Sequence, residues 1–97
     1  MTNDDIANKM KEALESAGGL SNSVKFDFGD DGQIVASGTE AVTFDDDADC
    51  TITISKDDFI ALSKGELDPM GAFMSGKLKV AGDMSVALGL QSLFASM

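Results

Sequence analysis

The chain has 97 residues, 43% of them hydrophobic, and a formal net charge of −10 that arises from 17 acidic residues and seven lysines. This length predicts one domain over residues 1–97, and the acidity, together with the lack of arginine, argues against nucleic-acid binding. No apolar run approaches the roughly 20 residues that cross a bilayer, so we expect no stable membrane insertion. The N-terminus is polar and acidic, which predicts a cytoplasmic location.

The first predicted element is a helix over residues 2–17. Its apolar side chains recur at helical spacing, at Ile6, Met10, Ala13, Leu14 and Ala17. Thr2 and Asp5 have the spacing of a capping box at its start, with aspartate in place of the usual glutamate. Gly18 and Gly19 follow, and glycine commonly ends a helix because it adopts the left-handed conformation without steric cost.

Four strands are predicted next, over residues 24–28, 33–37, 41–44 and 50–55. Alternate positions of the first and last of these are apolar and predict one buried face: Val24, Phe26, Phe28, Cys50, Ile52 and Ile54. The connections between successive strands are short and rich in Gly and Asp. Short connections of this kind favour an antiparallel meander with one oily face.

The hydrophobic period changes after the fourth strand. Two helices, a strand and a final helix are predicted, over residues 56–65, 69–75, 77–81 and 83–95. Asp68 has the position of an N-cap, and Pro69 suits the first turn of a helix. In the strand, Leu78 and Val80 are expected to point inward. This order predicts an α+β domain in which a mainly antiparallel sheet of about five strands has one face covered by helices.

The composition gives catalytic and metal chemistry little support. The chain lacks histidine, tyrosine, tryptophan and arginine, which removes the commonest general base and the usual nucleophile systems. The one cysteine, Cys50, allows neither an internal disulfide nor a zinc cluster, and its strand position predicts a small buried apolar residue. Residues 45–56 lack the glycine and glutamate of a calcium loop, and residues 71–78 lack the spacing and hydroxyl of a phosphate-binding loop. We therefore expect no enzyme activity, no metal and no cofactor.

The predicted final helix has more apolar surface than one packing face needs. At about 100° per residue, one arc of it holds Val86, Ala87, Leu90, Leu93, Phe94 and Met97. Met84 and Leu88 lie on a second arc, with Gln91 between the two. The second arc can fill a core, line a cavity or form a dimer surface, and periodicity alone favours the core. The Gln91 amide needs a hydrogen-bond partner, which could be backbone, water or the polar head of a ligand.

Several segments resemble the sterol carrier protein-2 (SCP2) domain family. They are "GELDPMGAFMS" at 65–75, "GKLKVAGDM" at 76–84 and "ALGLQSLF" at 87–94, and "DCTITISKDDFIAL" at 49–62 is similar to the strand-then-helix block of that family. The acid at Glu66 departs from many members, and the peroxisomal C-terminal tripeptide is absent. The chain looks like the small stand-alone bacterial form of the domain.

The resemblance implies a hydrophobic tunnel between sheet and helices that binds fatty acid, fatty acyl-CoA, sterol or another lipid without catalysis and carries it within the cell. By position, the tunnel would be lined by Phe59, Met70, Phe73, Met74, Met84, Leu88, Gln91 and Phe94. The alternative role is that of an accessory module that presents lipid to, or assembles with, a lipid- or quinone-modifying enzyme. We expect the protein to be a monomer or a weak dimer. We expect its partners to be a lipid ligand and, in the alternative role, an enzyme.

Overall fold

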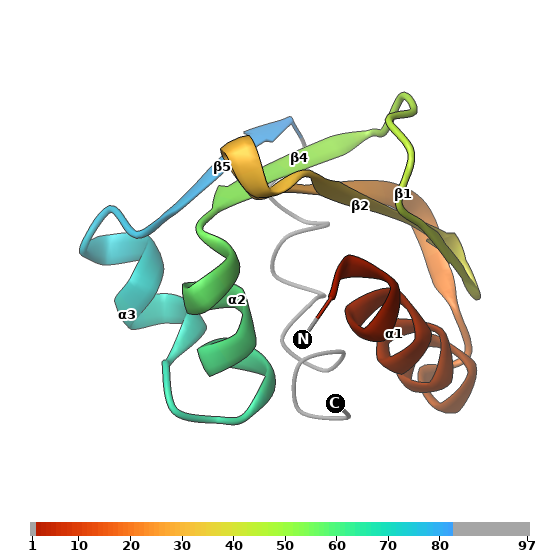
Figure 1. Cartoon of the computed structure of the whole chain (residues 1–97), viewed down its shortest axis with the longest axis horizontal. Coiled ribbons are helices and arrows are strands. Elements are labelled where there is room, and N and C mark those ends of the chain that lie inside the picture. Colours follow the sequence, from red (N-terminus) through yellow and green to blue (C-terminus); the bar gives the residue numbers. More distant parts are fainter. Residues whose placement is uncertain (1, 83–97) are drawn as a thin grey trace.

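The structure, a computed structural model, describes residues 2–82 and shows a twisted sheet with helices on one side of it (Figure 1). The helices are α1 (Asn3–Ala17), α2 (Lys56–Ser63) and α3 (Pro69–Met74), with a short 3-10 turn, η1, at Gly29–Asp31. The strands are β1 (Leu20–Asp27), β2 (Gln33–Gly38), β3 (Glu40–Val42), β4 (Cys50–Ile54) and β5 (Leu78–Gly82). The predicted α+β class, with about five mainly antiparallel strands and one covered face, is confirmed.

Helix α1 begins with the predicted capping box. The Asp5 backbone N–H donates to the Thr2 hydroxyl oxygen at 3.1 Å, and the Thr2 N–H donates to the Asp5 carboxylate at 3.1 Å. The second of these bonds holds the pKa of Asp5 below its ordinary value, because a carboxylate accepts a hydrogen bond better when it is ionised. Gly18 ends the helix in the left-handed conformation, as predicted. The apolar stripe is buried except at Ala17, which is exposed.

The sheet order, β3-β2-β1-β4-β5, corrects the predicted meander. β4 does not pair with β3, which precedes it in sequence, but lies parallel to β1, with Val24 opposite Cys50 and Phe26 opposite Ile52. The other three pairings are antiparallel. The prediction was wrong because an alternating pattern fixes which face of a strand is buried and says nothing of which strand lies beside it. A parallel pair needs a long connection, and here β2 and β3 lie within it.

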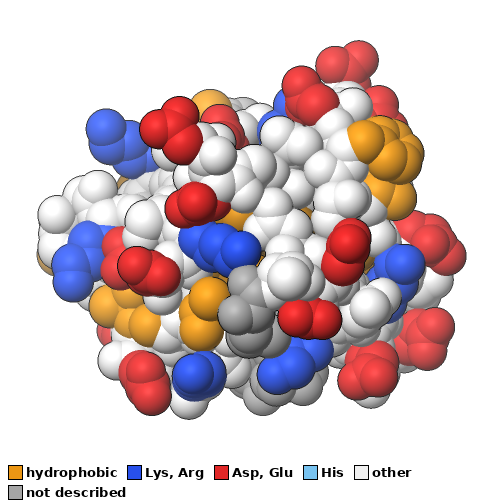
Figure 2. All heavy atoms as spheres, viewed as in Figure 1, with side chains coloured by type: hydrophobic (Ala, Val, Ile, Leu, Met, Phe, Trp, Pro, Cys, Tyr) orange, Lys and Arg blue, Asp and Glu red, His pale blue; other side chains and the backbone are white. Residues whose placement is uncertain are grey.

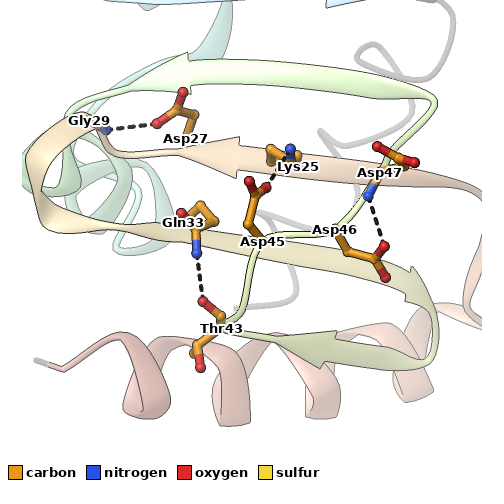
Figure 3. Close-up of polar contacts among 8 residues, drawn as sticks. All are labelled: Lys25, Asp27, Gly29, Gln33, Thr43, Asp45, Asp46 and Asp47. Carbon is orange, nitrogen blue, oxygen red and sulfur yellow. Dashed lines mark hydrogen bonds and ion pairs between the residues drawn. The ribbon is translucent and has the colours of Figure 1, made fainter.

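Polar contacts hold the segment that crosses from β3 to β4. The Lys25 ammonium on β1 lies 2.6 Å from the Asp45 carboxylate in this segment (Figure 3). This hydrogen bond raises the pKa of Lys25 and lowers the pKa of Asp45. At the far end of the segment, the Asp49 N–H donates to the Ser23 hydroxyl oxygen at 2.9 Å, and the Ser23 N–H donates to the Asp49 carboxylate at 3.1 Å. Part of the acidic run 45–49 therefore anchors a crossover.

The second half of the described chain follows the predicted signals closely. The Ser55 hydroxyl caps α2 by accepting from the Asp58 N–H at 3.1 Å, and the Asp68 carboxylate caps α3 by accepting from the Gly71 N–H at 3.3 Å. β5 runs antiparallel to β4, with Leu78 buried and Val80 packed against the core. The predicted final helix, with its two apolar arcs, lies outside the described residues.

The core residues lie between the covered sheet face and the helices. The sheet contributes Val24, Phe26, Phe28, Ile34, Ala36, Cys50, Ile52, Ile54 and Leu78, and the helices contribute Ile6, Met10, Leu14, Phe59, Leu62 and Ala72. The predicted inward faces of the first and fourth strands are confirmed. Within residues 2–82, no polar or charged residue is buried.

Candidate functional site

The interior beneath the sheet contains three packed phenylalanine rings. Phe59 of α2 lies edge-on to Phe26 of β1, with ring centroids 5.1 Å apart and an interplanar angle of 62°. The Phe28 ring lies 5.3 Å from Phe59 at 55°. Phe59 has an exposed fraction of 0%, so the first of the predicted site residues is an interior side chain at the junction of sheet and helices.

Helix α3 presents three predicted site residues to the surface. Met70, Phe73 and Met74 have exposed fractions of 50%, 42% and 83%. Their spacing, i, i+3 and i+4, brings neighbouring side chains together on a helix. Ala72, between them in sequence, is fully buried and faces the body of the protein. The structure thus separates the described site residues into one inside the core and three on an exposed helix.

Hydrogen bonds at both ends fix the position of α3. The Asp68 cap holds its start, and at its end the Lys77 N–H donates to the Ala72 carbonyl at 2.9 Å and the Gly76 N–H donates to the Phe73 carbonyl at 3.2 Å. Gly76 has a φ of 81°, the left-handed conformation that this type of helix end requires. The chain then turns directly into β5, so α3 is tied to the edge of the sheet.

The remaining four predicted site residues are Met84, Leu88, Gln91 and Phe94, and all of them lie outside the described residues. What is described of the site is apolar, since its interior contains no buried acid, base or nucleophile other than the thiol of Cys50. Residues 2–82 also contain no group of three side chains that could hold a metal ion. Such an interior can exclude water and accept an apolar surface.

A hollow that the sequence did not indicate lies at the β3 edge of the sheet, opposite the edge formed by β5. It is a groove of about 210 Å³ between α1 and the end of β3, lined by Asp4, Ala7, Asn8, Lys11, Ala41, Val42, Thr43 and Phe44. Phe44 has an exposed fraction of 63%. The groove depends on the packing of α1 against β3. The sequence analysis missed it because no local pattern in either segment predicts that contact.

These features define a small α+β domain in which helices cover one apolar face of a mixed five-stranded sheet. Residues 6–95 match the sequence profile of the SCP-2 sterol transfer family. The chain belongs to this family, as the resemblance of its segments indicated. Within residues 2–82, every helix is too short or too polar to cross a membrane.

Two groups of relatives match about half of the chain. Sterol carrier protein 2 of Rattus norvegicus is 49% identical over 61 residues, which are 61% of this chain and 11% of that protein. Hydroxysteroid dehydrogenase-like protein 2 of Homo sapiens is 44% identical over 52 residues, which are 54% of this chain and 12% of that protein. The chain therefore spans about a tenth of the length of these curated relatives.

Solved structures share the fold across nearly the whole chain. The solution structure of sterol carrier protein-2 from Aedes aegypti, in complex with the C16 fatty acid palmitate, has a TM-score of 0.81 and 24% identity, covering 97% of this chain and 94% of that one. UbiJ-SCP2, a ubiquinone synthesis protein, has a TM-score of 0.71 and 18% identity, covering 95% and 91%. The sec-alkylsulfatase Pisa1 from Pseudomonas sp. has a TM-score of 0.76 and 19% identity, covering 100% of this chain and 16% of that one.

Proposed function

We propose that this protein binds a hydrophobic ligand, a long-chain fatty acid in the first instance, in an apolar tunnel between the covered sheet face and the helices. Binding is non-catalytic and serves to carry the ligand through the cytoplasm. The observation that carries the proposal is membership of the SCP-2 sterol transfer family, joined to a fold shared with a palmitate-bound protein over 97% of the chain. The apolar interior supports it, because burial of an acyl chain is favourable by about 25 cal/mol per Å² removed from water.

The proposed tunnel has an inner end and a mouth. Phe59 forms part of its inner wall, beside the rings of Phe26 and Phe28. Its mouth is bordered by the exposed side chains of α3, which are Met70, Phe73 and Met74. Met84, Leu88, Gln91 and Phe94 complete the wall by their positions in the family motif. The Gln91 amide supplies a hydrogen bond to the polar head of the ligand. Methionine suits such a wall because its side chain adapts to varied apolar shapes.

The test combines native mass spectrometry of the purified protein with displacement of a fluorescent fatty acid. We expect bound lipid that organic solvent extracts, and saturable uptake by the emptied protein at micromolar concentration. Leu88→Trp is expected to block uptake while the fold survives, because the larger side chain fills the tunnel. Phe44→Trp, which places the same side chain at an exposed position after β3, is the matched control and should bind as the wild type does. A protein that is empty, monomeric and unable to bind the probe would refute the proposal.

A second role, as an accessory module of a lipid- or quinone-modifying enzyme, has its own support. The fold covers 91% of UbiJ-SCP2, a ubiquinone synthesis protein, and forms a 16% portion of the sec-alkylsulfatase Pisa1. Under this role the apolar surface would meet another protein. Native mass spectrometry separates the two roles, since the accessory role predicts a stable complex with an enzyme and the carrier role predicts a complex with lipid.

A further inference from the structure

The groove between α1 and the end of β3 collects polar side chains that have no partner within residues 2–82. Asp4, Asn8 and Lys11 line it from α1, and Thr43 lines it from the chain just after β3. Their carboxylate, amide, ammonium and hydroxyl groups take part in no hydrogen bond or ion pair with another residue of that range. Lys11 is nevertheless partly buried, although lysine is mostly exposed in proteins. Polar groups that converge on a hollow in this way are available to a ligand.

The α1 wall of the groove has a charge of opposite sign towards each end. Asp4, Asn8 and Lys11 follow one another at i, i+4 and i+7, so they lie along one face of the helix. Seven positions at 1.5 Å per residue place the backbones of Asp4 and Lys11 about 10 Å apart. Figure 2 shows acidic and lysine side chains interspersed over the part of the molecule that α1 occupies. The groove therefore matches a ligand with a cationic group at one end and an anionic group at the other.

The other wall of the groove is the end of an edge strand. Among the described strands, β3 is the outermost at its edge of the sheet, and α1 packs against it. Figure 3 shows α1 running alongside β3, with the Thr43 side chain on the side towards α1. The outer edge of such a strand offers backbone N–H and C=O groups to which an extended peptide can add. The buried Ala7 and Ala41 side chains line the groove, and the exposed Phe44 ring borders it.

The size and polarity of the groove narrow the class of ligand. Its volume of about 210 Å³ is below the range of about 300–1,000 Å³ that is typical of pockets for drug-sized molecules, which favours a smaller ligand. A peptide of three residues spans at most about 10 Å when extended, which is the separation of Asp4 and Lys11 along the helix. An acyl chain fits this groove poorly, because it would cover the carboxylate and the ammonium and leave both without a partner.

We infer that the groove binds a short extended peptide with free termini, which adds as a strand along the outer edge of β3. The peptide ammonium lies against Asp4, the terminal carboxylate lies against Lys11, and a central apolar side chain lies against Phe44. This site is separate from the proposed tunnel, because none of the groove residues belongs to it, so peptide binding and fatty-acid binding can each fail without the other. For a tripeptide of about 20 non-hydrogen atoms we expect a dissociation constant between about 0.1 and 1 mM.

The test is a titration of the isotope-labelled full chain with the tripeptide alanyl-leucyl-alanine, followed through the backbone amide signals by NMR. Saturable shifts are expected over residues 41–44 and along the groove face of α1. Amidation of the peptide C-terminus should weaken binding about threefold, and so should acetylation of its N-terminus, because each removes one ion pair. Lys11→Gln should weaken the free peptide about threefold and leave the amidated peptide unchanged, and Asp4→Asn should do the same for the free and the acetylated peptide. Lys9→Gln and Glu12→Gln, which change exposed residues of α1 outside the groove, are the controls and should bind as the wild type does.

Four outcomes would overturn peptide binding in the groove. The first is an absence of shifts at millimolar peptide, or shifts confined to other parts of the chain. The second is an equal loss for the free and the amidated peptide on Lys11→Gln, which a purely structural role of Lys11 would produce. The third is movement of the groove signals on dilution without peptide, which would assign the groove to a second copy of the chain. The fourth is movement of the same signals by palmitate. The two blocked peptides probe both contacts on the wild type, so the test does not depend on the folding of any variant.

Discussion

The aromatic packing around Phe59 allows the most direct test of the interior, through the substitution Phe59→Leu. The ring is fully buried and lies 5.1 Å from Phe26 and 5.3 Å from Phe28. Leucine has three fewer carbon atoms, and at about 0.8 kcal/mol per buried methylene their loss costs about 2 kcal/mol. Two aromatic contacts, at about 0.5–1.5 kcal/mol each, raise the expected loss to about 3–5 kcal/mol. Against a total of about 5–15 kcal/mol for a domain of this size, the variant should still fold.

The assay is urea unfolding of the wild type, the variant and a control. Phe44→Leu is the same substitution at a side chain with 63% exposure, and it should change the free energy of unfolding by less than about 0.5 kcal/mol. A double-mutant cycle with Phe26→Leu should give a coupling energy of about 1 kcal/mol, because the two rings touch. If Phe59→Leu costs no more than Phe44→Leu, the ring does not lie in a packed interior and the reasoning about the inner wall of the tunnel fails.

Three further predictions concern the backbone, a carboxylate and the thiol. Gly82→Ala should lower the free energy of unfolding in urea by about 2–4 kcal/mol, because Gly82 has a φ of 106° and an added Cβ would lie 2.6 Å from the Asp49 carbonyl oxygen. Gly65→Ala is the control, since Gly65 has a φ of 75° but no atom within 4 Å of an added Cβ, and it should cost only about 1–2 kcal/mol. Asp5→Asn should lower the melting temperature above about pH 4, where the wild-type carboxylate is ionised, and the difference should vanish as the pH falls through its lowered pKa; a gap independent of pH would contradict this. Cys50, 1% exposed, should react with a thiol reagent only as fast as urea opens the fold, and prompt labelling of the native protein would contradict its burial.

The sequence predicted the secondary elements well where local physics decides them. The capping box of α1, the N-caps Ser55 and Asp68, and the alternating faces of β1 and β4 are all local signals, and the structure contains each of them. These local signals could not predict the order of the strands in the sheet. The acidic run 45–49 has the composition of a tight turn. The parallel pairing of β4 with β1 and the hydrogen bonds between Ser23 and Asp49, 26 positions apart, show that it is a crossover.

The candidate site shows a different limit. An apolar i, i+3, i+4 pattern ordinarily marks the buried side of a helix, and on that basis Met70, Phe73 and Met74 would be expected inside. In α3 the buried position is instead Ala72, whose small side chain lets the helix pack closely on its neighbours. A helix of six residues has too few positions to show which of its sides is inward, so the exposure of these residues came only from the structure. Their part in a binding site stays a prediction.

The position of α3 has a consequence for the proposed uptake of a ligand. A helix of six residues is not stable in isolation, so the Asp68 cap, the buried Ala72 and the Lys77 hydrogen bond must hold it in place. Those same contacts place its three exposed side chains at the proposed tunnel mouth. A shift of α3 would therefore move the proposed mouth, whereas the groove at the β3 edge would stay where it is. A variant that loosens α3 is therefore expected to change uptake of the fluorescent fatty acid without unfolding the sheet, whose strands pair in the order β3-β2-β1-β4-β5.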